Sequence, residues 1–170
     1  MKKVSLLIGL LLLLSACGNS EMKEPTFEEL KDHAYIVEST TEEGIFVNYT
    51  SFTYIENVKL QTNQGERIKP TNIKTGSLIW YEDTGAIMES YPMQGTIKQL
   101  TLYDDKLSRR LEKGIAYFLN SYDMSDFIGV QLVSLEGKEL IIQFKGFSNP
   151  DAVYFATINL ETLKYDVNPQ

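Results

Sequence analysis

The stretch DDKLSRRLEKGIAYFLNSY, residues 104–122, decides the fold class, because it separates two β-rich halves of the chain. Its apolar residues recur at spacings of three and four, which predicts a helix with one apolar face. They are Leu107, Leu111, Ile115, Phe118, Leu119 and Tyr122. Asp104 and Asp105 stand where acidic side chains cap a helix N-terminus. The sequence therefore predicts an amphipathic helix in the middle of the chain.

Four short runs rich in β-branched and aromatic residues follow this helix, and turn residues join them in pairs. The runs are 129–135, 139–145, 153–159 and 163–167. One helix followed by an antiparallel meander predicts a helix lying on a sheet. This part faintly resembles the propeptide and PepSY-type domains of bacterial surface proteins, a likeness that assigns no role to any residue.

Six further runs of this kind precede the helix, which predicts a small barrel or a strongly curled sheet. We expect strands at 35–38, 45–49, 54–62, 77–82, 87–91 and 96–103. In the third run Val58 and Leu60 alternate with Lys59 and Gln61, the pattern of a strand with one solvated face.

Two segments within this half, TGSLIWY at 75–81 and GAIMESYPMQG at 85–95, carry a family resemblance. They resemble an uncharacterised family of OB-like domains found in small Gram-positive lipoproteins, whose specific feature is a Glu-Ser-Tyr-Pro-x-Gln loop, here Glu89 to Gln94. The match covers about residues 34–103, and Met93 stands where a small residue is usual. The family has no established activity, so the resemblance implies a fold and a surface location.

The N-terminal residues have the layout of a secretory signal. Lys2 and Lys3 precede the apolar run 4–14, and Leu14-Ser15-Ala16-Cys17 follows. These last four residues resemble the lipobox of bacterial lipoproteins. The resemblance implies a diacylglyceryl group on Cys17, cleavage just before it, and attachment to the outer side of the cell membrane. Two acyl chains hold a protein stably at a bilayer. The alternative is an ordinary signal peptide with a chance cysteine.

These observations predict four segments in an α+β protein. We expect a lipoprotein signal peptide at 1–16 and a lipidated tether at 17–32, with one helical turn within 26–31. A small OB-like β-barrel follows at 33–104, and a helix packed on an antiparallel meander at 105–170. Because almost no linker separates Tyr103 from the helix, we expect the two folded units to share an interface and move as one body.

Charge and residue content exclude several classes of function. The formal charge of −7 falls to −9 without residues 1–16, which hold two lysines and no acid; this disfavours nucleic-acid binding, which needs clustered cations. Cys17 is the only cysteine, so we expect no disulfide and no thiolate site. His33 is the only histidine, which argues against a catalytic triad.

The acidic pairs are more simply explained as helix caps and turns than as metal ligands. Asp104–Asp105 and Asp123–Asp126 lack the spacing of an EF-hand loop, so we expect no metal and no cofactor. A carboxylate pair for glycoside cleavage stays open, because its members can be distant in sequence.

One patch combines aromatic residues with a proline-stiffened polar loop, as on the binding faces of OB-like barrels. Its residues are Trp80, Tyr81, Glu89, Ser90, Tyr91 and Gln94. Alternatively, Trp80 fills the barrel and Tyr91-Pro92 shapes a corner.

The preferred functional hypothesis is a non-enzymatic surface lipoprotein that binds an extracellular protein or a wall component. The alternatives are an inhibitor or chaperone-like regulator of a secreted protease or cell-wall enzyme and, less favoured, a carboxylate-dependent wall hydrolase.

Overall fold

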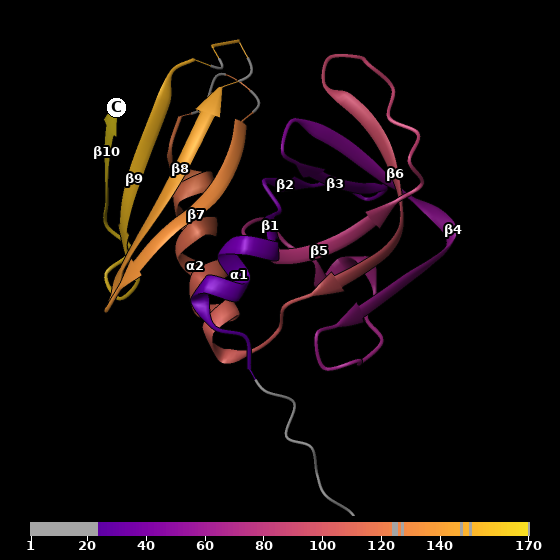
Figure 1. Ribbon diagram of the computed structural model, residues 1–170, viewed down its shortest axis with the longest axis horizontal. Coiled ribbons are helices and arrows are strands. Elements are labelled where there is room, and N and C mark those ends of the chain that lie inside the picture. Colours follow the sequence, from indigo (N-terminus) through magenta and orange to yellow (C-terminus); the bar gives the residue numbers. More distant parts are fainter. Residues whose placement is uncertain (1–23, 124–125, 127, 147, 150, 170) are drawn as a thin grey trace, which may run out of the picture.

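The computed structural model describes residues 24–123, 126, 128–146, 148–149 and 151–169. The predicted signal peptide, the predicted lipidation site Cys17 and the first part of the predicted tether lie outside these residues. Two β-sheets lie side by side, with α1 and α2 near their junction (Figure 1). The predicted α+β class is confirmed at this level.

The first sheet is six-stranded and curled, with the order β1-β5-β6-β4-β3-β2. Its neighbouring strands are antiparallel except for β4 and β6, which run parallel. The strands are β1 (Tyr35–Ile36), β2 (Ser39–Thr40), β3 (Gly44–Val47), β4 (Thr50–Thr62), β5 (Leu78–Asp83) and β6 (Met93–Leu102), and a short 3-10 helix, η1 (Pro70–Asn72), lies between β4 and β5.

A single extended segment, residues 35–40, supplies both edge strands of this sheet. Its first half, β1, pairs with β5, and its second half, β2, pairs with β3. Between them, the Val37 N–H donates to the Ser77 carbonyl and the Glu38 N–H donates to the Phe46 carbonyl, both at 2.9 Å. This segment gives the sheet its curled, half-barrel form.

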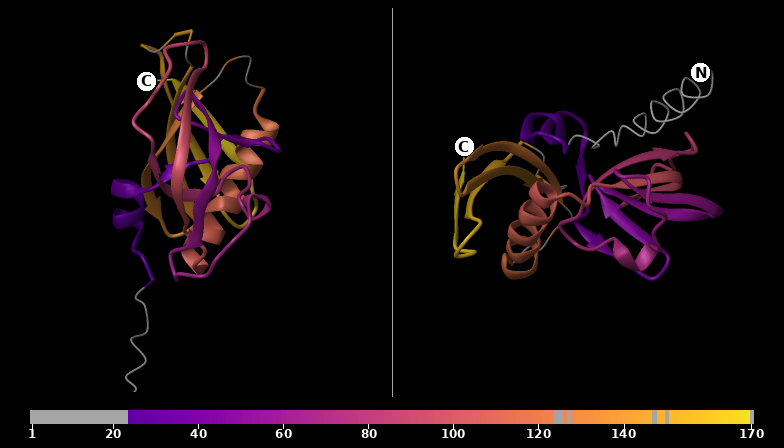
Figure 2. Two further views of the ribbon diagram at one scale, coloured as in Figure 1. Left: turned by 90° about the vertical axis from the view of Figure 1, so that its right-hand side faces the viewer. Right: turned by 90° about the horizontal axis from the view of Figure 1, so that it is seen from below.

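The second sheet is an antiparallel meander in the order β10-β9-β8-β7, and it curves round α2 (Figure 2). The helix α2 (Lys106–Ser121) begins at Asp105, whose side chain accepts a hydrogen bond from the Ser108 N–H at 3.0 Å. The predicted helix, its cap and the meander are therefore confirmed. The strands are β7 (Ile128–Glu136), β8 (Glu139–Gly146), β9 (Val153–Asn159) and β10 (Tyr165–Pro169).

The helix α1 (Phe27–His33) falls largely within the range predicted as a tether. Thr26 and Glu29 form a capping box at its start. Leu30 is completely buried, and it belongs to one apolar cluster with Ile36, Leu78, α2 and the second sheet. The second unit's core therefore includes residues from the first half of the chain.

The strand predicted at 87–91 is wrong. These residues lie in the loop joining β5 to β6, where Met88 and Gln94 form only an isolated bridge. Because β5 and β6 are antiparallel neighbours, the chain must reverse direction between them. Pro92 also has no N–H group to donate to a neighbouring strand. The last strand also begins later than predicted, at Tyr165, because Leu163 takes a left-handed conformation with φ 58°.

Among the residues that the structure describes, neither helix has the length and apolar content needed to cross a bilayer.

Candidate functional site

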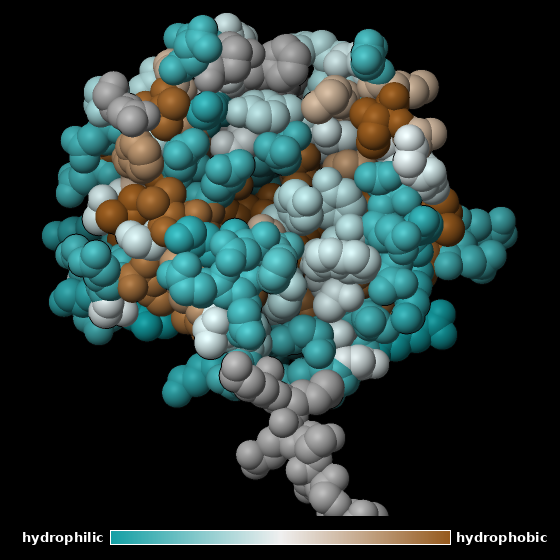
Figure 3. Space-filling model, in the orientation of Figure 1, coloured by the Kyte–Doolittle hydropathy of each residue, from teal (hydrophilic) through white to brown (hydrophobic). Residues whose placement is uncertain are grey.

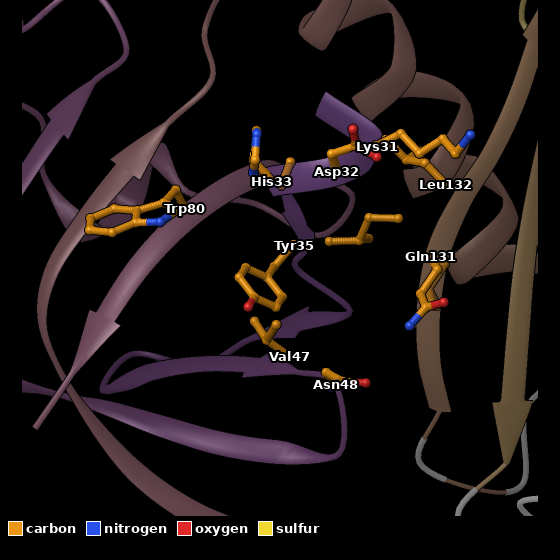
Figure 4. Close-up of a pocket in the computed structure, with 12 residues that line it drawn as sticks. Lys31, Asp32, His33, Tyr35, Val47, Asn48, Trp80, Gln131 and Leu132 are labelled. Atoms are coloured by element: carbon orange, nitrogen blue, oxygen red, sulfur yellow. The ribbon is translucent and has the colours of Figure 1, made fainter. Parts of the chain in front are cut away.

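A cleft of about 530 Å³ lies where the two sheets meet (Figure 4). Four parts of the fold line it: the end of α1 with β1, the end of β3 with its turn, β5, and β7 of the second sheet. The lining residues are Lys31, Asp32, His33, Ala34, Tyr35, Ile36, Val47, Asn48, Trp80, Val130, Gln131 and Leu132.

The cleft has an apolar floor and a polar rim. Ile36, Val47, Val130 and Leu132 are buried beneath it, and its charged and amide residues are exposed. The molecule is hollowed in the middle of this face, with hydrophobic surface inside and hydrophilic residues at the margins (Figure 3). This arrangement suits a ligand that has both apolar and hydrogen-bonding surfaces.

Two aromatic residues contribute to the lining. Tyr35 is 42% exposed, and its ring lies 4.8 Å from that of Tyr81, centre to centre. The side chain of Gln131 on β7 points into the gap between β7 and the chain around Asn48 (Figure 4). Trp80 is partly buried but packs against neither apolar core. Both residues line the cleft, with Tyr35 on the same face of the sheet as Tyr81 and Trp80 on the opposite face.

The β3–β4 turn places Asn48 at the rim. Asn48 and Tyr49 have φ of 47° and 66°, the left-handed pair that a two-residue hairpin turn requires. The Tyr49 hydroxyl donates to the Lys145 carbonyl at 3.2 Å. A Cβ on Gly129 would lie 2.6 Å from the Tyr49 ring. Glycine at this position thus lets the turn approach β7 closely.

Glu38 connects the two walls of the cleft from below. Its Oε1 accepts hydrogen bonds from the backbone N–H groups of Asn48 and Val130, both at 3.1 Å. The residue is buried, and its Oε2 has no hydrogen-bond partner among the described residues. Burial raises the pKa of this carboxyl from 4.5 to about 8. The raised pKa favours the protonated acid at neutral pH, and its two hydrogen bonds hold the β3–β4 turn against β7.

The six residues predicted to form one binding face do not lie together. Trp80 and Tyr81 point to opposite sides of β5, with Tyr81 packed on the inner core of the curled sheet. Trp80 therefore does not fill the barrel, and it is the only one of the six that lines the cleft.

The other four belong to the β5–β6 loop or the start of β6, where Glu89, Ser90, Tyr91 and Gln94 are all exposed. The Tyr91 hydroxyl donates to Asp126 Oδ1 at 2.9 Å. The loop therefore touches the second unit instead of extending the surface around Trp80.

Sequence reasoning missed the cleft and Glu38. In the sequence, Glu38 is only the last residue of the strand predicted at 35–38, and the two residues that donate hydrogen bonds to it lie 10 and 92 positions away. Contacts between residues so far apart leave no pattern near Glu38 from which they could be predicted. His33 does lie at the rim, with Lys31 and Asp32, but none of the described residues that line the cleft is a serine, threonine or cysteine. Nowhere in the described ranges do three or more His, Cys, Asp or Glu residues gather as metal ligands would.

No protein-family model, no curated protein and no solved structure matches this chain.

Proposed function

We propose that this chain is a surface lipoprotein, anchored to the outer side of the membrane through Cys17, whose folded part binds a ligand without altering it chemically. The observation that carries the binding proposal is the cleft between the sheets, with its apolar floor, polar rim and two aromatic rings. The N-terminal sequence features carry the proposal for the anchor.

The proposal includes an OB-like first unit. An OB-fold is a five-stranded, partly open Greek-key barrel. Counting β1 and β2 as two halves of one strand gives five strands, of which β2, β3 and β4 form a meander. The parallel pairing of β4 with β6 and the contact of residues 35–40 with both sheet edges support this description.

Binding in the cleft can be followed directly, because Trp80 is the only tryptophan of the chain. A soluble wall digest and a secreted-protein fraction are each titrated into the full-length protein while Trp80 emission and its quenching by acrylamide are recorded. We expect a saturable change in emission and reduced quenching with one of them. An unchanged Trp80 signal with both would overturn the cleft as the binding site.

The anchor is tested separately by metabolic labelling with a fatty-acid probe. We expect the full chain to be labelled and to sediment with membranes, and Cys17→Ser to lose the label. A native chain found unlabelled in the cytosol would contradict the proposed anchor.

The exposed tip of the β5–β6 loop favours a second candidate, regulation of a secreted protease or wall enzyme. Ile87, Met88 and Tyr91 are 41%, 60% and 56% exposed, and large apolar side chains exposed together are common at protein contacts. In this case Met88→Ser would lose a partner captured by the native chain, whereas Gln131→Ala would keep it.

A further inference from the structure

The size and position of the cleft limit its occupant to a small segment of ligand. A cavity of about 530 Å³ lies within the range of small-molecule sites, roughly 300–1,000 Å³. Its walls come from both sheets, so an occupant touches β1 and the β3–β4 turn on one side and β7 on the other.

The charges at the rim do not favour a highly charged ligand. Lys31 and His33 stand beside Asp32 at the end of α1, whereas a phosphate-rich ligand is usually held by clustered cations. Apart from the two aromatic residues, the remaining polar side chains are the amides of Asn48 and Gln131, one from each wall. Each amide both donates and accepts hydrogen bonds, as hydroxyl groups do.

An extended peptide is also disfavoured. A peptide joins a sheet edge through free backbone N–H and C=O groups. On β7 the N–H of Val130 points away from β8 and is already held by Glu38 Oε1 at 3.1 Å. The edge of β7 that faces the cleft is therefore partly occupied by a side chain of the protein itself.

From these features we infer that the cleft binds a neutral carbohydrate segment, with a sugar ring against Tyr35 or Trp80 and its hydroxyls bonded to Asn48 and Gln131. A pyranose has an apolar C–H face and a circumference of hydroxyls, which match the aromatic rings and the two amides. The inference rests on the proposed function of the cleft and adds the chemical class of the ligand. Glu38 is a positioning residue in this site, because it holds the backbones of Asn48 and Val130 in place.

The test uses the full-length protein in a detergent without a sugar headgroup, with Trp80 emission as the signal. The probes are chitobiose, cellobiose, tri-alanine, inorganic phosphate, and the glycan and peptide fractions of a wall digest, separated after an amidase has cut the peptides from the glycan. We expect a saturable response to at least one disaccharide and to the glycan fraction, and none to the peptide fraction.

Two variants locate the site, and a third serves as a control. Gln131→Ala and Asn48→Gly, the latter compatible with the left-handed turn, should each weaken saccharide binding roughly tenfold, as expected for the loss of one good hydrogen bond. Gln64→Ala removes the same kind of side chain from an exposed turn outside the cleft and should bind like the native protein. Near-ultraviolet circular dichroism checks that each variant is folded.

The outcomes separate this inference from the function on which it rests. A response to tri-alanine, to phosphate or to the peptide fraction, without one to any saccharide, would overturn the carbohydrate and leave the binding cleft standing. Saccharide binding unchanged in both variants would place the sugar elsewhere. No response to any of these probes, nor to the secreted-protein fraction, would overturn both proposals.

Discussion

The Glu38 carboxyl accepts hydrogen bonds from two backbone N–H groups, that of Asn48 in the β3–β4 turn of the first sheet and that of Val130 in β7 of the second. Because it is buried between them with one unpartnered oxygen, the neutral acid is favoured over the carboxylate. Its pKa, raised from 4.5 to about 8, makes stability depend on pH. Between these values the folded state keeps a proton that the unfolded state has lost, so stability falls as the pH rises and levels off above about 8.

Glu38→Gln should remove this dependence, because an amide resembles the protonated acid and does not titrate. We expect the variant to be close to the native protein in stability near pH 4.5 and to exceed it above pH 8. The upper bound on the gain is about 5 kcal/mol, from 1.36 kcal/mol per pKa unit. Urea unfolding of both proteins across this pH range measures the difference. Parallel stability curves would show that Glu38 is not the titrating group.

Local signals were enough to predict some residues but not others. Asp105 could be predicted as a cap, because its partner Ser108 is three residues away. Glu38 and Trp80 could not be placed, because the surroundings of each come from strands far along the chain. The sequence marked Trp80 as a candidate but grouped it with a loop that lies elsewhere.

At the level of elements, α2 packs against the turn before β5 so closely that only glycine fits there. Gly76 has φ 86°, and a Cβ on it would lie 2.6 Å from the Glu112 carbonyl oxygen and 2.7 Å from the Ala116 nitrogen. Both contacts are to the backbone of the helix, which cannot move aside as a flexible side chain can.

Gly76→Ala should therefore destabilise the protein by more than about 3 kcal/mol, combining a left-handed alanine with a steric clash. Gly65→Ala is the matched control, since Gly65 has φ 83° and open space around its Cβ position. It should cost only about 1 kcal/mol. Chemical unfolding of the two variants gives both values, and equal losses would show that the helix does not press on this turn.

Periodicity predicted the elements better than their pairing. The apolar stripe of α2 and the β-rich runs of the second sheet placed α2, β8 and β9 almost to the residue, whereas β10 begins two residues later than predicted. The parallel pairing of β4 with β6 left no such trace, because alternation shows which face is buried and not which strand lies beside it. Residues 87–91 have strand-like composition, but the reversal between β5 and β6 prevents pairing there.

The whole molecule is joined by a core that crosses the predicted unit boundary. Leu30, Ile36 and Leu78 from the first half pack with α2 and the second sheet. Further hydrogen bonds link the halves, including Ser77 Oγ to Glu112 Oε2 at 3.0 Å. Separating the units would expose this apolar surface to water.

We therefore expect one cooperative unfolding transition. Trp80 fluorescence reports on the first unit and far-ultraviolet circular dichroism on the whole chain, and their midpoints should coincide. Limited proteolysis should not release a stable fragment cut near Asp105. Two separate midpoints, or such a fragment, would show that the units fold independently.

The position of Leu30 also bears on when the protein can fold. This residue emerges early from the ribosome, yet its cluster includes Ile158 and Leu160, which are synthesised more than a hundred residues later. Until β9 and the turn after it have been synthesised, α1 lacks part of the apolar surface against which Leu30 packs. Contacts between residues so far apart in sequence make folding slow. The core of the first sheet, by contrast, uses only residues between Val37 and Leu102 and is complete before α2 is synthesised. During synthesis we therefore expect α1 to wait for its partners while the curled sheet beside it can already form.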